Sequence, residues 1–353
     1  MKTVTVKAGK GYEVRIGRGL LPEIGRQIVG IAGVKRVMIV SDDNVYPLYG
    51  ETVRSSLLKA GYETETFVFP HGEASKNLTV YGELLGRLCD AGLTRDDLLV
   101  ALGGGVVGDL AGFAAATYRR GIPFVQVPTT LLAAVDSSVG GKTAVDLPNG
   151  KNQVGAFYQP ALVLCDPDTL GTLPEVEYRN GCAEIIKYGV LDGAELFGKL
   201  SDRPVREQYE DIIERCVAIK RDYVEADEFD RGLRMLLNLG HTIGHAVEAC
   251  SDFEIPHGQG VSIGMAAIAR ASVSNGLCSA ETAQNVIALL TKYGLPTEIP
   301  YGVKELAAAA GSDKKNTGAS MRLVIPEAIG NCTVHTIPAS DFPEWLRKGG
   351  ANE

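Results

Sequence analysis

Several features typical of membrane proteins and nucleic-acid-binding proteins are missing from this sequence. No apolar stretch reaches the roughly 18 uncharged residues that a bilayer-spanning helix needs. The N-terminal segment MKTVTVKAGKGYEVRIG alternates like a strand and lacks the apolar core of a signal peptide. The net charge is -8, and the chain contains no run of Lys and Arg. We therefore expect neither nucleic acid nor a membrane among its partners.

Paired cysteine motifs are missing as well. The seven cysteines lie singly at positions 89, 165, 182, 216, 250, 278 and 332, without a Cys-x-x-Cys pair. This spacing favours reduced thiols over a disulfide framework. We expect a cytoplasmic protein.

The chain does have enough residues for two domains with cores of their own, because it is 353 residues long and 45% hydrophobic. In the first half, apolar β-branched runs alternate with segments of helical periodicity, which predicts βαβ units and a parallel sheet. The expected strands are 34–42, 62–70, 98–105, 123–130 and 161–167, and the expected helices between them are 46–60, 77–92 and 108–119.

Beyond about residue 175 the sequence becomes rich in Ala, Leu and Glu with helical periodicity. The expected helices here are 175–200, 205–226, 231–251, 258–276, 280–294 and 303–310. The predicted fold is therefore an α/β domain with a parallel-rich sheet, residues 1–174, followed by a mostly α-helical domain, residues 175–353.

A glycine-rich loop, residues 103–109 (GGGVVGD), follows an expected strand and opens an expected helix. In this context backbone N–H groups and the helix N-terminus can bind a pyrophosphate. The usual dinucleotide fingerprint also has an acidic residue about 20 positions later, and residues 123–130 contain none. Asp42 and Asn44, at the end of strand 34–42, are alternative ribose contacts. We favour a nucleotide site, with a structural turn as the alternative.

The segment 136–152 (DSSVGGKTAVDLPNGKN) combines two lysines with Ser, Thr and Gly, a composition suited to binding phosphate and hydroxyl oxygens. Only Gly141-Lys142-Thr143 resembles a Walker A sequence, because Asp136 stands where its first glycine belongs. A P-loop is thereby excluded. A solvated loop with incidental lysines is the alternative to an anion-binding segment.

Three of the five histidines, His241, His245 and His257, fall within 17 residues. The first two are i, i+4 neighbours on one face of an expected helix. Pro256-His257-Gly258 is expected to be a loop that folds back on that face. Since imidazole is the commonest protein metal ligand, a metal site is one interpretation. Two buried, hydrogen-bonded core histidines are the other.

Glu184 and Lys187 are i, i+3 neighbours on an expected helix, a spacing typical of a surface ion pair. Glu184 would also supply the carboxylate for a three-ligand zinc site with the histidines. Further cations in this half of the chain are Lys220, Arg234 and the Asp313-Lys314-Lys315 turn. Each is either surface charge or a contact to an anionic substrate that carries phosphate and carboxylate groups.

Five motifs follow one another along the chain: the glycine loop, SSVGGKTAVDLPNGKN, NGCAEIIKYG, LNLGHTIGHAVE and PHGQGVSIGM. In this combination the sequence resembles the 3-dehydroquinate synthase family over roughly residues 36 to 325. The resemblance implies an NAD-binding α/β domain, a helical domain that binds metal and substrate, and a homodimer. It also implies NAD and one divalent metal, usually zinc with cobalt as a substitute.

The activity implied by the resemblance is a lyase reaction of the shikimate pathway, which supplies chorismate and the aromatic amino acids. The family converts 3-deoxy-D-arabino-heptulosonate 7-phosphate to 3-dehydroquinate and phosphate. The sequence of steps is transient oxidation by NAD, phosphate elimination, re-reduction, ring opening and intramolecular aldol closure.

The resemblance also assigns residues. The metal ligands would be Glu184, His241 and His257. NAD would contact Asp42, Asn44, Glu73, Lys76, Gly104, Gly105, Asp109, Thr129, Thr130, Lys142, Lys151 and Thr172. Substrate would contact Asp136, Lys142, Asn152, Lys187, Lys220, Arg234, Asn238, Lys314 and His245, the last as a polar or proton-transfer group. Lys315 is the alternative to Lys314, and Arg120 would reach across a dimer interface.

Three alternatives remain at the level of sequence. Another sugar phosphate cyclase would share NAD, metal and elimination, but Arg234, Asn238 and His245 match the carboxylate-binding pattern of the dehydroquinate synthases. A metal-dependent polyol dehydrogenase of the glycerol dehydrogenase type would release NADH as a product. A non-catalytic binding module is disfavoured because every expected polar position is occupied.

Overall fold

The computed structural model describes residues 1–31, 33–148, 150–311 and 320–353. The chain divides into two compact units, the first made of residues 1–174 and 213–229 and the second of residues 175–212 and 230–353. One border falls after Pro174, where the sequence pattern changes. Residues 213–229 nevertheless belong to the first unit, although their helical pattern resembles that of the second.

The first unit is built on a seven-stranded sheet with the order β1-β2-β9-β6-β5-β3-β4. Its strands are β1 (Lys2–Val6), β2 (Tyr12–Ile16), β3 (Arg36–Asp42), β4 (Glu63–Phe69), β5 (Leu98–Gly103), β6 (Phe124–Pro128) and β9 (Leu162–Cys165). All neighbours pair in parallel except β1 and β2, which form an antiparallel hairpin. The carboxyl ends of the parallel strands meet at one edge, where ligands bind in such sheets.

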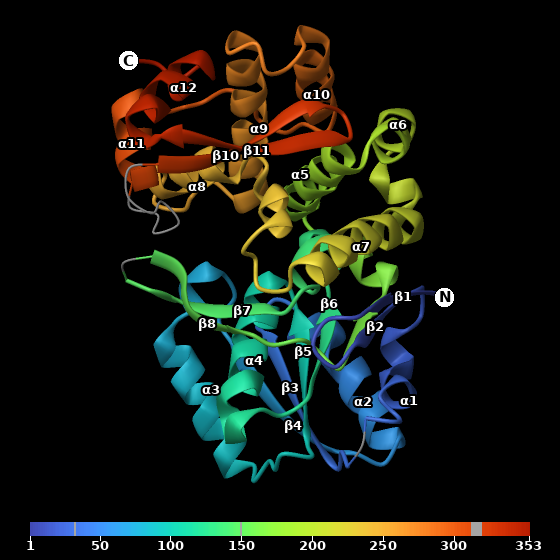
Figure 1. Cartoon of the computed structure of the whole chain (residues 1–353). Coiled ribbons are helices and arrows are strands. Elements are labelled where there is room, and N and C mark those ends of the chain that lie inside the picture. The colour runs from blue at the N-terminus through green and yellow to red at the C-terminus, as the bar shows by residue number, and fades with distance from the viewer. Residues whose placement is uncertain (32, 149, 312–319) are drawn as a thin grey trace. The chain divides into compact units, whose positions relative to one another are not determined.

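Helices cover both faces of this sheet (Figure 1). They are α1 (Ile24–Gln27), α2 (Glu51–Lys59), α3 (Leu78–Asp90) and α4 (Gly105–Thr117). Along β3, Val37 and Ile39 belong to the core shared with α1 and α2, whereas Met38 and Val40 belong to the core shared with α3 and α4. A strand that is apolar on both faces thus has a helical layer on each side, as expected for a parallel sheet.

Two further elements complete the first unit. The strands β7 (Lys142–Leu147) and β8 (Gly150–Phe157) form a separate antiparallel hairpin. Most of α7 (Tyr209–Ala226) also belongs here, because Glu214 pairs with Lys2 at 2.6 Å and Glu225 accepts a hydrogen bond from the Lys7 backbone N–H at 2.7 Å.

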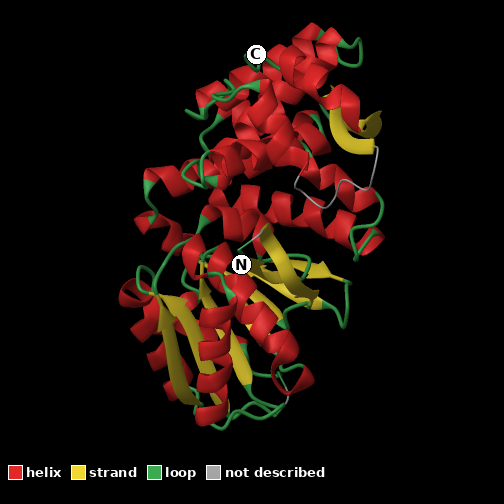
Figure 2. Ribbon diagram, turned by 90° about the vertical axis from the view of Figure 1, so that its left-hand side faces the viewer, coloured by secondary structure: helices red, strands yellow, loops and turns green. Residues whose placement is uncertain are grey.

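The second unit is mostly helical, with one two-stranded antiparallel sheet (Figure 2). Its helices are α5 (Glu175–Asp192), α6 (Ala194–Asp202), α8 (His241–Cys250), α9 (His257–Ser274), α10 (Ala280–Lys292), α11 (Val303–Gly311) and α12 (Phe342–Lys348). Its strands are β10 (Ser320–Ala328) and β11 (Asn331–Pro338). Helix α9 lies at the centre of this unit, buried along most of its length and packed against α5, α8, α10 and α12.

The predicted fold class is confirmed, since a parallel-rich α/β part precedes a mostly helical part. Several details differ from the sequence-based expectation. The expected helices 175–200 and 231–251 are interrupted, before α6 at Gly193 and before α8 at Gly240. The segment 136–152 forms much of the β7–β8 hairpin, the β10–β11 hairpin was not predicted, and His257 is the first residue of α9 and not part of a loop. None of the helices in the described part of the chain combines the length and apolarity that a bilayer crossing requires.

Candidate functional site

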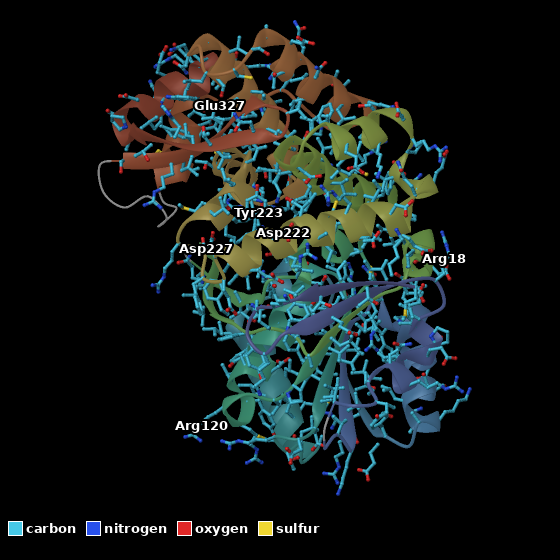
Figure 3. The ribbon with its side chains drawn as sticks, turned by 45° about the vertical axis from the view of Figure 1, so that its right-hand side comes forward. Arg18, Arg120, Asp222, Tyr223, Asp227 and Glu327 are labelled. Carbon is cyan, nitrogen blue, oxygen red and sulfur yellow. The ribbon has the colours of Figure 1, made fainter. Side chains whose placement is uncertain are left out.

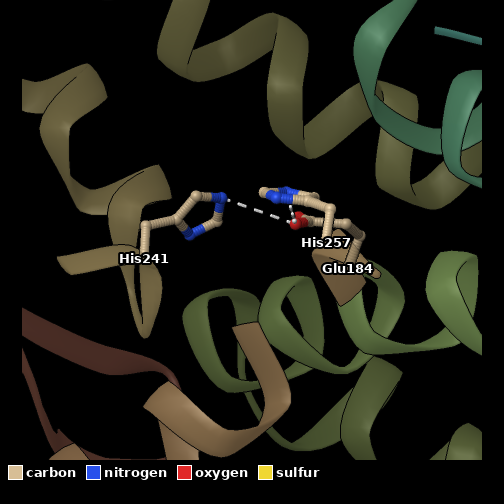
Figure 4. A group of neighbouring side chains, drawn as sticks. All are labelled: Glu184, His241 and His257. Carbon is tan, nitrogen blue, oxygen red and sulfur yellow. Dashed lines mark ion pairs between the residues drawn. The ribbon is translucent and has the colours of Figure 1, made fainter. Parts of the chain in front are cut away.

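Three helices of the second unit contribute one side chain each to a compact group of candidate metal ligands (Figure 4). Glu184 lies within α5, while His241 and His257 are the first residues of α8 and α9. The Oε1 atom of Glu184 is 3.5 Å from Nε2 of His241 and 3.3 Å from Nε2 of His257. Two imidazoles and one carboxylate form a typical donor set for a catalytic zinc ion that keeps an open position.

Glycines allow these three helices to approach one another closely. A methyl group added at Gly264 of α9 would lie 1.9 Å from the carbonyl oxygen of Gly240, the residue before α8. One added at Gly258 would lie 2.4 Å from the carbonyl oxygen of Asn180 on α5. Gly240 also has a φ of +80°, a backbone conformation that residues with a side chain rarely adopt. The glycines of GHTIGH and PHGQGVSIG therefore set the distances within the ligand group.

The two histidines differ in their ionisation. Burial lowers the pKa of His241 well below its usual value, and the charge of Lys187 adds to this effect. The Nδ1 atom of His241 lies 3.1 Å from the Leu239 carbonyl oxygen, which assigns the proton to Nδ1 and directs the Nε2 lone pair toward Glu184. For His257, burial alone would lower the pKa, but hydrogen bonds to Glu184 and Glu248 outweigh burial and raise it to about 10.

Other predicted substrate contacts surround this group in the second unit. Lys187 forms an ion pair with Glu184, and the ring of His245 is centred 5.4 Å from that of His241. Arg234 and Asn238 lie on the turn Leu233–Asn238, which packs against α5 and leads into α8. The side chains of Lys187 and Arg234 are almost completely buried, which is unusual for cations unless they are paired.

In the first unit, a second polar cluster surrounds the buried Lys76. Its Nζ atom lies 2.6 Å from Oδ2 of Asp109 and donates a hydrogen bond of 2.5 Å to Oδ1 of Asn152. Glu73 lies 3.8 Å from Lys76 and 3.9 Å from Lys151. Burial opposes the charge of Lys76, but Asp109 and Glu73 outweigh it and raise the pKa of this lysine. All five residues of this cluster are among the NAD and substrate contacts that the resemblance implies.

The glycine loop lies beside this cluster, because Asp109 is on the first turns of α4. Gly104 is the N-cap residue of α4, and a methyl group added to it would lie 3.0 Å from Cγ2 of Thr130. Thr129 follows β6 and is buried, and its Oγ1 has no hydrogen-bond partner among the residues that the structure describes. A buried hydroxyl of this kind normally has a partner, so Thr129 is suited to a bound ligand.

The remaining first-unit residues occupy several places. Asp42 ends β3, and its Oδ1 accepts hydrogen bonds from the backbone N–H groups of Asn44 and Val45 at 3.0 and 2.8 Å. The Oγ1 of Thr172 lies 2.6 Å from the hydroxyl of Tyr49.

Asp136 is held by Lys220 of α7, whose Nζ forms an ion pair with the carboxylate and donates a 2.8 Å hydrogen bond to the Asp136 carbonyl oxygen. Lys142 is an exposed residue at the start of β7.

Arg120 is not brought near the Lys76 cluster of its own unit. Arg120 lies beyond the C-terminal end of α4, about 20 Å along the helix from Gly105 at a rise of 1.5 Å per residue. Figure 3 accordingly shows it on the side of the first unit opposite Asp222 and Tyr223 of α7. Lys314 and its alternative Lys315 lie outside the described residues.

Comparisons with known proteins agree with this arrangement. Residues 66–180 match the family model "3-dehydroquinate synthase N-terminal" and residues 181–316 match "3-dehydroquinate synthase C-terminal". This chain belongs to the 3-dehydroquinate synthase family. It is 46% identical to a 3-dehydroquinate synthase of Streptococcus suis (strain 05ZYH33), over 95% of this chain and 97% of the relative. It is 47% identical to that of Pelobacter propionicus, over 97% and 98%.

Solved structures of sugar phosphate cyclases share the fold of this member of the 3-dehydroquinate synthase family. A 2-epi-5-epi-valiolone synthase from Streptomyces hygroscopicus subsp. jinggangensis, solved with NAD+ and Zn2+, has a TM-score of 0.87 at 27% identity over 99% of both chains. A 2-deoxy-scyllo-inosose synthase, solved with carbaglucose-6-phosphate, NAD+ and Co2+, has a TM-score of 0.90 at 24% identity over 99% of this chain and all of the other.

The sequence of this 3-dehydroquinate synthase family member did not lead us to expect Glu248 near the candidate metal ligands. Glu248 of α8 is buried, and its Oε1 lies 3.0 Å from Nδ1 of His257. Together with His245 and His257 it forms a second group with metal-ligating atoms within 4.8 Å of one another. The available signal was its i, i+3 spacing from His245, which places both on one face of α8.

Proposed function

We propose that this chain is a 3-dehydroquinate synthase that converts 3-deoxy-D-arabino-heptulosonate 7-phosphate to 3-dehydroquinate and phosphate, with NAD and one divalent metal, zinc or cobalt. The observation that carries the proposal is the convergence of Glu184, His241 and His257 from three helices, in a chain of this family. The enzyme class that follows is a carbon–oxygen lyase acting on phosphate.

The metal would be held by Glu184, His241 and His257. The donor set fits a zinc-type ion, because both histidines direct Nε2 toward the same buried carboxylate oxygen. When bound, the metal would polarise the vicinal hydroxyls of the substrate and acidify the hydroxyl at carbon 5. The ammonium group of Lys187 forms an ion pair with the Glu184 carboxylate.

NAD would be held in the first unit. The backbone N–H groups at the start of α4 and the glycines Gly104 and Gly105 suit a pyrophosphate. The buried Oγ1 of Thr129, without a partner among the described residues, supports the fit. The other proposed contacts are Asp42, Asn44, Glu73, Lys76, Asp109, Thr130, Lys142, Lys151 and Thr172. When bound, NAD would accept a hydride from carbon 5 of the substrate and return it within the same turnover.

Two cationic side chains, each with an asparagine amide, would hold the two anionic ends of the substrate. Lys142 and Asn152 would hold the phosphate, and Arg234 and Asn238 the carboxylate, since charge-assisted hydrogen bonds orient such groups strongly. His245 would move a proton near the reacting carbons, a task suited to an imidazole. Asp136, Lys187, Lys220, Lys314 and, from a second subunit, Arg120 complete the proposed substrate contacts.

The reaction balances without a net oxidant. After oxidation at carbon 5, the substrate loses the neighbouring C–H proton and its C–O bond to phosphate. Reduction at carbon 5, ring opening and an intramolecular aldol addition then give 3-dehydroquinate. The chain contributes chiefly by holding the intermediates in a reactive geometry.

We further propose that the enzyme works as a cytoplasmic homodimer. All seven cysteines are free, which suits a reducing compartment. The position of Arg120, about 20 Å along α4 from the glycine loop, is compatible with a role at a second subunit rather than at its own.

Two other activities are the alternatives. The sugar phosphate cyclases discussed above share the fold, and a protein of Sinorhizobium meliloti 1021 described as "a probable glycerol dehydrogenase" shares it more distantly, with a TM-score of 0.62 at 14% identity. Arg234, Asn238 and His245 match a site for a substrate carboxylate, which favours a 3-dehydroquinate synthase over both alternative activities.

The test is phosphate release from the heptulosonate phosphate by zinc-loaded protein with a trace of NAD, while NADH absorbance is followed. We expect many phosphates per NAD without accumulation of NADH. Release of NADH in step with turnover would assign a polyol dehydrogenase. No phosphate release from a folded protein that binds NAD and zinc would assign a cyclase that acts on another sugar phosphate.

A further inference from the structure

Glu248 contacts the ring of His257 on the side away from Glu184. The Nε2 atom of His257 lies 3.3 Å from Oε1 of Glu184, and the Nδ1 atom lies 3.0 Å from Oε1 of Glu248. The two ring nitrogens of this histidine therefore have separate carboxylate partners. Only Nε2 points into the group of Glu184, His241 and His257.

The Glu248 carboxylate is held in this position by close packing. Glu248 is 2% exposed, and it lies on α8 where that helix meets α9. A methyl group added at Gly260 of α9 would lie 3.0 Å from Cγ and 3.2 Å from Oε1 of Glu248. The missing side chain at position 260 thus makes room for the carboxylate beside the first turn of α9, which His257 begins.

His241 has an equivalent arrangement with a different partner. Its Nδ1 lies 3.1 Å from the carbonyl oxygen of Leu239, and its Nε2 is directed toward Glu184. Both histidines thus have an oxygen acceptor for a proton on Nδ1, so Nε2 is the nitrogen that can become the metal ligand. A neutral imidazole can bind a metal through one nitrogen only when its proton stays on the other.

We propose that Glu248 is a positioning residue of the metal site, which fixes the tautomer and the ring orientation of His257 so that Nε2 is the ligand atom. This inference depends on the metal role proposed for Glu184, His241 and His257. Metal-bound histidines commonly donate their other ring N–H to a carboxylate, and loss of that partner weakens metal binding by about 10- to 100-fold.

The competing interpretation is that Glu248 is itself a ligand, in the group of His245, Glu248 and His257. Simultaneous occupation of both groups would require His257 to bind one metal through each nitrogen. The Nδ1–H that donates to Glu248 would then be lost. The two interpretations predict different metal stoichiometries, one ion per chain for a positioning role and two if Glu248 ligates a second ion.

The experiment compares the full-length parent with Glu248→Ala and Glu248→Gln. Zinc affinity is measured by chelator competition, cobalt stoichiometry and the cobalt absorption spectrum by titration, and the protonated nitrogen of His257 by ¹⁵N NMR. In Glu248→Ala we expect about 10- to 100-fold weaker zinc binding, an altered cobalt spectrum, and one ion per chain. Glu248→Gln keeps an acceptor for Nδ1–H and should recover most of the affinity.

The matched control is Ser262→Ala on the same helix as His257. Ser262 is buried and donates a 2.7 Å hydrogen bond to the Pro296 carbonyl oxygen, so its loss tests general destabilisation. We expect its zinc affinity and cobalt spectrum to equal those of the parent.

Each contrary result has a distinct meaning. A folded parent that binds no metal would overturn the metal site and, with it, the proposed function. Two cobalt ions per parent chain, with one lost in Glu248→Ala, would overturn the positioning role in favour of a ligand. Unchanged zinc affinity and an unchanged cobalt spectrum in Glu248→Ala would likewise overturn it. So would unchanged zinc binding in Glu248→Gln if NMR shows that the proton on Nδ1 of His257 is lost.

Discussion

The side chain of Lys76 is buried against Asp109, with 2.6 Å between Nζ and Oδ2. This ion pair connects the segment after β4 to the start of α4. The backbone strengthens the connection, because the Lys76 carbonyl oxygen accepts a 2.7 Å hydrogen bond from the N–H of Asp146 in β7. Lys76 therefore links the start of α4, through Asp109, to the β7–β8 hairpin.

Asp109→Asn should lower the free energy of unfolding by about 3 kcal/mol, because it leaves the buried ammonium without its main counter-charge. Denaturant unfolding measures this, and NAD affinity should fall in parallel. Lys76→Met combined with Asp109→Asn should recover part of the stability, since no unpaired charge remains. Glu65→Gln, which breaks the exposed pair with Arg87, is the control and should cost under about 1 kcal/mol. Equal stability of Asp109→Asn and parent would show that the ion pair is not structural.

Gly264→Ala should damage the second unit severely. The new methyl group would lie 1.9 Å from the Gly240 carbonyl oxygen, so α8 and α9 would have to separate. Overpacking of this kind costs about 1–3 kcal/mol or more, and zinc binding should weaken because both histidines begin these helices. Gly86→Ala in α3 is the control, because its methyl group meets nothing within 4 Å. It should be neutral or stabilising by up to about 1 kcal/mol. Normal zinc binding by Gly264→Ala would contradict the role given to helix packing.

His257→Ala should remove the metal. We expect zinc affinity to fall by more than about 100-fold, because even the outer partners of metal ligands contribute up to that amount. Metal content after gel filtration measures the effect. His335→Ala is the control, since His335 packs against Trp345 in the same unit, with ring centres 5.8 Å apart. Full metal content in His257→Ala would mean that His245 or another residue is the third ligand.

Metal binding should become stronger as pH rises. In the metal-free protein the pKa of His257 is raised to about 10, so at neutral pH the ring carries a proton that a metal at Nε2 must displace. His241, with its lowered pKa, is already neutral there. One proton is therefore released per metal, and zinc affinity should rise about tenfold per unit between pH 7 and 9. Calorimetry in buffers of different ionisation enthalpy counts the protons. An affinity that does not change with pH would contradict the charged state of His257.

Lys142→Met should weaken the hold on the substrate phosphate more than it weakens NAD binding, because Lys142 is only one of the many side chains proposed to contact NAD. Loss of one charge-assisted hydrogen bond predicts a decrease of about 10- to 100-fold in kcat/KM. Lys151→Met is the comparison, because Lys151 lies 3.9 Å from Glu73, both residues are proposed NAD contacts, and its loss should weaken NAD binding instead. Steady-state kinetics and NAD titration separate the two. Turnover of Lys142→Met at the parent rate would show that the phosphate lies elsewhere.

Much of this organisation could be predicted from the sequence where patterns are local. The strand at Arg36–Asp42 is apolar on both faces, so its place inside a parallel sheet followed from period and composition. His241 and His245 could be placed on one helix face by their spacing. The crowding of the histidines also singled out His257, and Glu184 was a candidate carboxylate. Which of these residues bind the metal could not be decided by spacing, and only the motif resemblance assigned Glu184, His241 and His257.

The features that were missed depend on contacts between distant segments. The β7–β8 hairpin is rich in Gly, Asn and Lys and only partly buried, so it lacks the apolar alternation of a core strand. His257 is the first residue of α9 and follows Pro256, which has an extended backbone. In the sequence, the Pro-His-Gly pattern is typical of a loop, so the start of the helix was not predicted. The role proposed for Glu248 depends on Gly260, whose missing side chain makes room for the carboxylate beside α9. No local sequence pattern contains this contact.

The most direct test of the central claim is carbon-13 NMR of the reaction of 3-deoxy-D-arabino-heptulosonate 7-phosphate with zinc-loaded protein and a trace of NAD. The account predicts that the substrate signals are replaced by those of 3-dehydroquinate, a carbocycle, in an amount far above the NAD supplied. A product that keeps its phosphate and is oxidised in proportion to NAD, or a substrate left unchanged by folded protein with both ligands bound, would contradict it.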